Sequence, residues 1–329
     1  MIRQAKYFVS DGTEPCRNLA VEEYLFHMTE EGSCILYLWR NRHTVVIGRN
    51  QNCWKECKLD LLEEEGGTFV RRRSGGGAVY HDLGNLNFTF LTTKSDYHLE
   101  KQIQVVLEAV NSFGLHARSE GRNDLVINGR KFSGNAFMEE HNRCCHHGTI
   151  MVQVDLERLS RYLKVSLKKI QSKGIDSVKA RVVNLTDFNS QITVDSLKTA
   201  LLEAFGRVYG LTPLRIEELD ETEVQKISQK YQSEQWKYNR FDEISCAMEE
   251  RYLWGGITLE YLIHDAVITE CRAYSDAMDA DFIPRIQNAL TGCEFRKEAM
   301  IFRVVNVDTE TEERQRMKDD VIEMIAKLK

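Results

Sequence analysis

The chain has 329 residues, of which 42% are hydrophobic and 29% are charged, a balance typical of a globular protein with ample apolar surface to bury. Its formal net charge of −6 argues against general nucleic-acid binding, which needs a basic excess. No apolar run approaches the roughly 20 residues that span a bilayer. The first residues carry no signal-peptide pattern, so we expect a cytoplasmic protein with no membrane or nucleic-acid partner.

The length and the uneven charge predict two domains. From Cys246 onward the sequence has 11 Lys and Arg residues against 17 Asp and Glu residues, whereas the residues before it are balanced. We place a linker at residues 238–242. The expected division is a large domain over residues 1–241 and a small C-terminal domain over residues 242–329.

Hydrophobic periodicity predicts three helices in the N-terminal third, over residues 18–30, 59–65 and 99–113. The second and third are followed by glycines, which commonly end helices. Two apolar runs, 35–39 and 44–47, are separated by a short polar turn. This pattern predicts a hairpin.

A run of three arginines, residues 71–73, leads through Ser74 directly into three glycines, residues 75–77. Glycines let backbone N–H groups form an anion-binding concavity, and guanidinium groups suit phosphate or carboxylate. The alternation from Leu86 to Phe90 then predicts a strand, which fits neither a Walker A loop nor a dinucleotide-binding fingerprint. We therefore predict an anion site of another kind; the alternative is a Gly-rich hairpin with solvated arginines.

Asn128-Gly129 is the second informative feature, because this dipeptide between apolar residues is a strong hairpin signal. Strict alternation puts Lys131 and Ser133 on one face of the strand and Phe132 on the other. If Phe132 packs inward, Lys131 points into a cleft; otherwise it is a solvated edge charge. Asp124, just before the hairpin, is a candidate Mg²⁺ ligand or an ordinary turn residue.

The run Cys144-Cys145-His146-His147 suggests a metal site at first sight. However, adjacent side chains do not converge easily on one tetrahedral ion, and no second cluster at ligand spacing stands nearby, so we do not predict one. The nine cysteines include no C-x-x-C pair, which favours reduced thiols over a disulfide framework or a zinc ribbon.

The remaining sequence predicts helices at 155–163, 166–174, 197–209 and 223–235, a hairpin over 257–274, and a terminal helix whose apolar stripe is Met317, Val321, Met324 and Leu328. Asp155 and Ser166 are the expected N-caps.

Several motifs together resemble the lipoate-protein ligase A family. They are the run from Arg72 to Asn85, Gly121–Leu125, Arg130–Gly134 and His146–Thr149. The resemblance extends from Asn18 through 39–41 and 46–49 to 177–185, where Lys179 and Ala180 replace the commoner Arg and Ser. It implies an α/β (α+β) fold: a large catalytic domain of the biotin and lipoate protein ligase type with a mixed sheet, and a small C-terminal α+β accessory domain.

The resemblance also implies a two-step reaction. Lipoate and ATP, with Mg²⁺, first give lipoyl-AMP and pyrophosphate. A lysine of an acceptor protein then takes the lipoyl group as an amide; the acceptors are lipoyl domains of 2-oxoacid dehydrogenase E2 subunits and the glycine-cleavage H protein. The accessory domain would move between the two steps.

Roles for individual residues follow from the same resemblance. Lys131 is implied as the catalytic group that contacts both ATP and the lipoate carboxylate. Asp124 stays the candidate Mg²⁺ ligand for the ion that the reaction uses. The implied ATP-binding residues are Arg72, Gly77, Ala78, Val79, Tyr80 and Lys131. The implied lipoate-binding residues are Lys131, Arg73, Ser74, Gly76 and His147.

Three other functions stay open at this point. A transferase of the same fold could carry octanoyl or lipoyl groups on a cysteine thioester without ATP, with Cys144 or Cys145 as nucleophile. A transferase could also use preformed lipoyl-AMP. A carrier-binding module without catalysis is disfavoured by the intact Arg72, glycines and Lys131. The complete Arg-rich loop and the C-terminal domain favour the ATP-dependent ligase over the cysteine enzyme.

Overall fold

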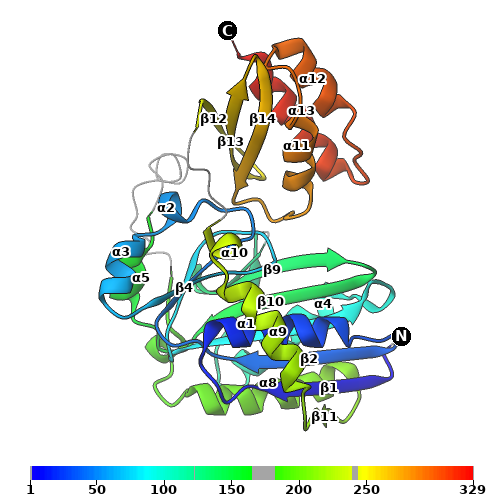
Figure 1. Ribbon diagram of the computed structural model, residues 1–329. Helices are drawn as coiled ribbons and strands as arrows, with labels where there is room; N and C mark the ends of the chain where they lie inside the picture. Colours follow the sequence, from blue (N-terminus) through cyan, green and yellow to red (C-terminus); the bar gives the residue numbers. More distant parts are fainter. Residues whose placement is uncertain (1, 122, 165–181, 239–243, 329) are drawn as a thin grey trace. The chain divides into compact units, whose positions relative to one another are not determined.

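The computed structural model describes residues 2–121, 123–164, 182–238 and 244–328 (Figure 1). Two compact units share these residues. The first consists of Met1–Val46, Trp54–Arg72 and Ala78–Lys237, and the second of Ile47–Cys53, Arg73–Gly77 and Tyr238–Lys329. The predicted domain boundary at 241/242, the predicted helix at 166–174, and the motif residues Arg122, Ser177 and Val178 lie outside the described residues.

The first unit is built on a mixed eight-stranded sheet in the order β11-β1-β2-β6-β10-β9-β8-β7. Strand β1 pairs in parallel with both β2 and β11, and the pairs from β2 through β6, β10, β9 and β8 to β7 are antiparallel. The strands are β1 (Gln4–Val9), β2 (Ser33–Trp39), β6 (Asn85–Thr93), β7 (Arg118–Glu120), β8 (Asp124–Ile127), β9 (Arg130–Glu140), β10 (Arg143–Met151) and β11 (Leu214–Arg215).

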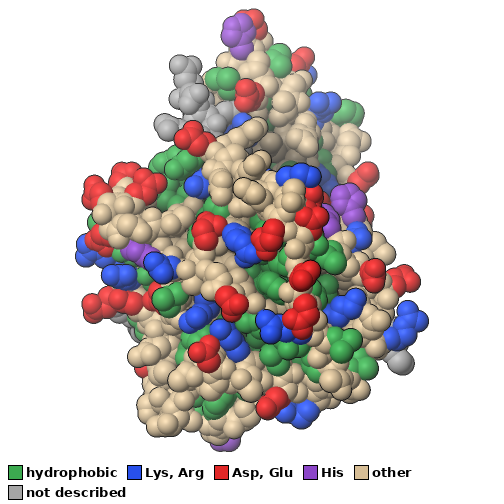
Figure 2. All heavy atoms as spheres, turned by 60° about the horizontal axis from the view of Figure 1, so that its bottom comes forward, with side chains coloured by type: hydrophobic (Ala, Val, Ile, Leu, Met, Phe, Trp, Pro, Cys, Tyr) green, Lys and Arg blue, Asp and Glu red, His purple; other side chains and the backbone are tan. Residues whose placement is uncertain are grey.

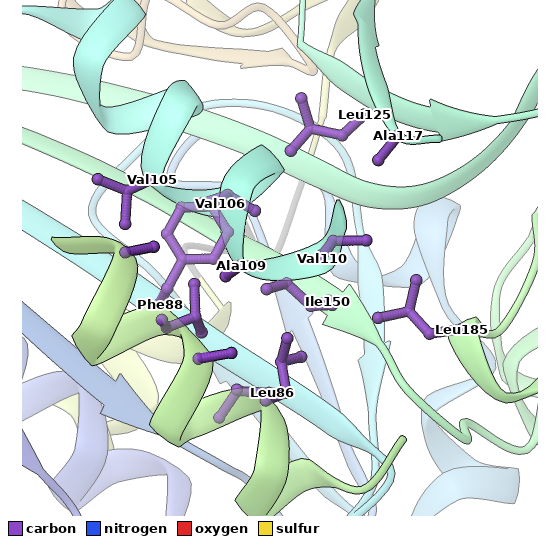
Figure 3. Close-up of a cluster of buried hydrophobic side chains, with 14 of the residues drawn as sticks. Leu86, Phe88, Val105, Val106, Ala109, Val110, Ala117, Leu125, Ile150 and Leu185 are labelled. Carbon is purple, nitrogen blue, oxygen red and sulfur yellow. The ribbon is translucent and has the colours of Figure 1, made fainter. Parts of the chain in front are cut away.

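Helices α4 (Leu99–Asn111) and α8 (Val194–Tyr209) cover one face of this sheet. In Figure 3, Leu86, Phe88 and Ile150 of the sheet lie against Val105, Val106, Ala109 and Val110 of α4. Gly114, with φ of 78°, follows α4 as the sequence predicts, and Gly210, with φ of 65°, follows α8 in the same way. The apolar side chains of the two helices and of this face of the sheet together form a buried core, as the hydrophobic periodicity of the helices predicts.

Helices α1 (Pro15–His27) and α9 (Glu221–Gln232) cover the other face, and α10 (Glu234–Tyr238) follows α9. Helix α1 begins three residues before the predicted start, because the Glu14 side chain caps it and accepts from the N–H groups of Cys16 and Arg17. On the part of the surface drawn in Figure 2, basic and acidic side chains are intermixed. This agrees with the balanced charge of the first 245 residues.

A second, three-stranded sheet in the order β4-β3-β5 also belongs to the N-terminal sequence. It consists of β3 (Thr44–Ile47), β4 (Thr68–Arg71) and β5 (Val79–His81), and the short helices α2 (Cys53–Glu56) and α3 (Leu59–Glu64) lie in the same stretch of sequence. Helix α5 (Leu156–Tyr162) comes later in the chain and contacts β5 and α3. The predicted hairpin of 35–39 with 44–47 is therefore wrong. Both edges of β2 are taken by β1 and β6, so the run 44–47 pairs elsewhere.

The second unit contains the antiparallel sheet β12-β13-β14, formed by Cys246–Tyr252, Gly255–His264 and Val267–Ser275. Helices α11 (Phe282–Leu290), α12 (Lys297–Val305) and α13 (Glu312–Ala326) pack against it around a core of its own. The predicted hairpin and terminal helix are confirmed, although Leu328 lies just beyond the end of α13.

The predicted α/β (α+β) class is also confirmed. Within the described residues, none of the helices has the length and apolar character that crossing a membrane requires.

Candidate active site

Strand β6 is buried along its whole length although polar residues alternate with apolar ones from Asn85 to Phe90. Leu86, Phe88 and Phe90 face the apolar core under α4 and α8. Asn85, Asn87 and Thr89 therefore face the opposite side, because neighbouring side chains of a strand alternate. Polar side chains buried in this way mark the α1 side of the sheet as a place for chemistry rather than for packing alone.

A hydrogen-bonded group lies at the centre of this polar face. His147 of β10 stands opposite Thr89 in the sheet register. The Thr89 hydroxyl donates to Glu22 Oε2 of α1 at 2.7 Å, and His147 Nδ1 lies 2.9 Å from the same oxygen. The Trp39 indole donates to Thr89 Oγ1 at 3.1 Å. Glu22 and His147 are each 8% exposed, so the carboxylate and the ring are held in one arrangement.

Arg72 lies close enough to Glu22 and His81 for their charges to interact. Its side chain is buried and donates to the Val46 carbonyl at 3.3 Å. Burial lowers the Arg72 pKa to about 10, and the Glu22 carboxylate opposes that shift. His81, which contacts Asn41, has its pKa lowered to about 3 by burial first and then by Arg72 and His147. A desolvated cation, an acid and two imidazoles are therefore close enough to affect one another's charge.

Lys131 lies at the start of β9, directly after the predicted turn. Asn128 and Gly129 both have positive φ, 52° and 75°, and connect β8 to β9, which confirms the hairpin. The Lys131 ammonium lies 2.6 Å from Asp124 Oδ1, and the two side chains are 34% and 39% exposed. A Cβ on Gly134 would stand 2.8 Å from the Lys131 Nζ atom. Glycine at position 134 therefore leaves the space that the ammonium occupies.

The prediction that Lys131 and Ser133 share a face is wrong. Lys131 pairs with Val126 and Ser133 pairs with Leu125, so the register shifts by one residue between them. Because Leu125 and Val126 point to opposite sides, Lys131 and Ser133 do so too. Phe132 packs into the apolar core, as predicted, and Ser133 is fully buried. The bulge keeps the ammonium on the polar side of the sheet, where Asp124 and Gly134 also lie.

The glycine-rich loop 73–77 belongs to the second compact unit. The Gly76 N–H donates to the Ala277 carbonyl at 2.9 Å, and the Arg49 N–H donates to the Ser74 carbonyl at 2.9 Å. A Cβ on Gly75 would lie 2.3 Å from the Ala277 oxygen, and a Cβ on Gly48 would lie 2.2 Å from the Gly76 oxygen. In this structure the glycines permit close backbone approach, and the Gly76 N–H is bonded to protein.

The other predicted site residues directly follow the glycine-rich loop in the chain. Val79 and Tyr80 are in β5 and Ala78 precedes it. The Tyr80 ring packs against His43 and Tyr162, and burial raises its pKa to about 12. Thus Arg72, Ala78, Val79, Tyr80, Asp124, Lys131 and His147 fall in the first unit, whereas Arg73, Ser74, Gly76 and Gly77 fall in the second.

The two candidate nucleophiles, Cys144 and Cys145, face opposite sides of the large sheet. Cys144 pairs with Thr92 of β6, which pairs in turn with the core residue Cys34 of β2. Burial raises the pKa of the Cys144 thiol to about 11, with Glu139 adding to the effect. Cys145 is the next residue and so faces the polar side. Its sulfur belongs to a group in which a Glu22 oxygen, a His147 nitrogen and the sulfur all lie within 4.8 Å of one another.

Four members of this group were not predicted from the sequence: Glu22, Thr89, Trp39 and His81. The alternation of Asn85, Asn87 and Thr89 could have predicted a buried polar face. A strand with one apolar face and no charged residue on the other is suited to burial on both sides. Glu22 gave little signal, since an acidic residue in a helix is ordinary on a solvated face.

Comparisons with known proteins define the family. Residues 14–206 match the lipoyl protein ligase A/B catalytic domain, and residues 242–325 match the bacterial lipoate protein ligase C-terminus. A Bdellovibrio bacteriovorus protein named lipoate-protein ligase A is 38% identical over 91% of each chain, and one of the same name from Psychrobacter cryohalolentis is 37% identical over 95% of each. The chain therefore belongs to the lipoate-protein ligase A family.

Solved structures agree with this assignment. The crystal structure of P. falciparum LipL1 in complex with lipoate has a TM-score of 0.83 at 26% identity and covers 97% of this chain and 99% of that one. A lipoate-protein ligase A bound with ATP has a TM-score of 0.63 at 26% identity, covering 71% of this chain and 98% of that one. A bipartite ligase from Thermoplasma acidophilum, described with its E2 lipoyl domain, has a TM-score of 0.64 at 28% identity, covering 74% and 99%.

Proposed function

We propose that this protein activates lipoate with ATP as lipoyl-AMP and transfers the lipoyl group to a lysine of an acceptor protein. Family membership supports this activity, as do a relative solved with lipoate and another solved with ATP. The single structural observation that carries it is the position of Lys131, whose ammonium is held on the polar side of the sheet by the hairpin, the bulge and Gly134.

The first step joins two anions, the lipoate carboxylate and the α-phosphate of ATP. Such a step needs cations and oriented donors more than it needs a base. In our proposal Lys131 bridges the carboxylate and the α-phosphate, which offsets their repulsion and fixes the direction of attack. Arg72, which is buried and permanently charged, and the backbone of Gly77, Ala78, Val79 and Tyr80 bind the nucleotide.

A Mg²⁺ ion fits the residues present. Magnesium commonly binds through one or two carboxylates together with substrate phosphates and water. Asp124 is a partly exposed carboxylate next to the Lys131 ammonium, so it offers one oxygen ligand at the side chain proposed to meet the phosphates. We propose that Asp124 holds the ion, which supplies charge compensation for pyrophosphate when bound.

The lipoate contacts are proposed to come from Lys131, Arg73, Ser74, Gly76 and His147. His147 is held by Glu22 on a buried polar patch, so its ring is positioned before any ligand arrives. Preorganised groups of this kind bind without the cost of ordering a side chain.

The acceptor in our proposal is a lipoyl domain of an E2 subunit or the glycine-cleavage H protein. One solved relative is described with its E2 lipoyl domain, and this supports the acceptor class. The division into a catalytic domain of residues 1–241 and an accessory domain of 242–329, and the cytoplasmic location, stay predictions.

The experiment that tests the function is pyrophosphate release by the purified full-length chain with lipoate, Mg²⁺ and ATP, before any acceptor is added. We expect stoichiometric release and a protein-bound adenylate, followed by labelling of a lipoyl domain. No release without acceptor, but labelling from synthetic lipoyl-AMP, would contradict the ATP-dependent step and favour the transferase that uses preformed adenylate.

A second candidate is acyl transfer through a thioester on Cys145. The proximity of its sulfur to His147 and Glu22 favours this residue over Cys144. A hydroxylamine-sensitive acyl group on the protein, formed from an acylated carrier without ATP and lost in Cys145→Ser, would support it.

A further inference from the structure

Cys145, His147 and Glu22 form a cluster of potential metal ligands, of which only His147 is a proposed lipoate contact in the ligase reaction. Cys145 and His147 are two residues apart on β10, so their side chains share the polar face, and Glu22 approaches from α1. The sulfur, a ring nitrogen and a carboxylate oxygen lie within 4.8 Å of one another. These three side chains can converge on one ion, unlike those of adjacent residues, because the set skips His146 and its third member comes from a distant helix.

The distances suit a metal ion. Around a tetrahedral zinc ion, with bonds of about 2.0 to 2.3 Å, ligand atoms stand roughly 3.5 Å apart. Glu22 Oε2 and His147 Nδ1 are already 2.9 Å apart. The cluster thus needs side-chain adjustments on the order of 1 Å to enclose an ion.

The ligand chemistry indicates which ions fit. Thiolate and imidazole ligands favour zinc and similar borderline ions over magnesium and calcium, which prefer oxygen. The thiolate and the carboxylate together carry two negative charges and match a divalent ion, and charge compensation of this kind is what a site with ligands 8% exposed or less requires. Thr89, which donates to Glu22, can orient the carboxylate as an outer partner.

We propose that Glu22, Cys145 and His147 form a binding site for Zn²⁺ or a chemically similar divalent ion, with a fourth position open to water or a small ligand. The site links α1 to the centre of the large sheet. Since His147 is also a proposed lipoate contact, the ion and lipoate should compete. This consequence rests on the proposed function, whereas metal binding itself does not.

The first test is titration of the chelator-treated full-length protein with Co²⁺, an optical substitute for Zn²⁺. We expect one equivalent to bind, with a thiolate-to-cobalt charge-transfer band in the near ultraviolet, and Zn²⁺ to displace it. Cys145→Ser keeps the side-chain size and should remove the band and weaken Zn²⁺ binding by at least about 10-fold. Glu22→Gln should weaken binding in the same direction.

Cys144→Ala is the matched control, because this thiol lies on the same strand, is equally buried, and points to the other face. Its cobalt spectrum and affinity should equal those of the unaltered protein. Absence of stoichiometric binding, an unchanged spectrum in folded Cys145→Ser, or loss of the band in folded Cys144→Ala would each overturn the site. If the ion binds but does not raise the lipoate concentration needed for pyrophosphate release, the shared place with lipoate is refuted while the metal site stands.

Discussion

The two faces of the large sheet use the same strands for different purposes. On β6, Phe88 and Phe90 pack under α4 and α8, whereas Asn87 and Thr89, one residue away in each case, lie on the side of Glu22, His147 and Lys131. On β10, His146 and His147 divide in the same way. The apolar face needs volume and tight packing, while the polar face needs charges and donors in fixed places. Because side chains alternate along a strand, a strand that is buried on its two faces can supply apolar packing on one face and polar groups on the other.

The largest effect expected on the apolar face is that of Phe88→Ala. Phe88 is fully buried and its ring packs on Phe90 and His146, so the change should lower the free energy of unfolding by about 3 to 5 kcal/mol. Denaturant unfolding measures this. Asn87→Ala, the next residue but on the other face, should cost about 1 to 3 kcal/mol through its lost hydrogen bond with Asn85. Equal losses from the two variants would contradict the division between the faces.

The largest effect expected on the polar face is that of Lys131→Ala. Removing a principal electrostatic donor should lower adenylate formation by about 10²-fold or more, with little change in stability because the side chain is one-third exposed. Pyrophosphate release measures the first quantity and thermal unfolding the second. Arg130→Ala is the control, since that guanidinium donates to the Val182 carbonyl and has no proposed role. Near-normal release from Lys131→Ala would refute the assignment.

Gly134→Ala tests whether the position of the ammonium matters. The added methyl group would stand 2.8 Å from Nζ and 2.9 Å from Cε, so the flexible end of Lys131 must move. A displacement of this size should lower adenylate formation by about 10-fold. In the Lys131→Ala background the same change should have no further effect, which a double-mutant cycle checks. Additive losses would show that Gly134 acts without Lys131.

The smallest expected effect is the pH dependence due to His146 on the apolar face. Burial, followed by the influence of His147, lowers the His146 pKa to about 3. The unfolded chain, with a histidine pKa near 6.5, binds a proton that the folded state excludes, so stability is fully present above about pH 6.5 and falls toward pH 3. His146→Gln should flatten this loss by roughly 1 kcal/mol per pH unit.

Chemical unfolding at a series of pH values between 7 and 4 measures the slope. His116→Gln, at an exposed position, serves as the control and should leave the slope unchanged. An identical slope in His146→Gln would show that this imidazole does not titrate on unfolding in that range. The pH dependence of stability would then be the same for the buried His146 as for the exposed His116.

The sequence by itself determined most of the helices, the Asn128-Gly129 turn and the inward packing of Phe132, because these depend on periodicity and on local backbone preferences. It also indicated the family through motifs that lie close together in the chain. Predicted features failed where a distant partner decided the outcome. The run 44–47 left β2 because β1 and β6 occupy both edges of that strand, and Ser133 turned to the other face because pairing with β8 inserts a bulge.

Only the tertiary structure could place Glu22 beside Thr89, His147 and Cys145, or unite residues 73–77 with residues 275–281 in one compact unit. These groups are far apart in the chain, and no local rule relates a helix carboxylate to one particular strand. On β6 and β10, alternation decided which residues could share a face. The choice of partner depended on sheet order and on the packing of α1, which are properties of the whole folded unit.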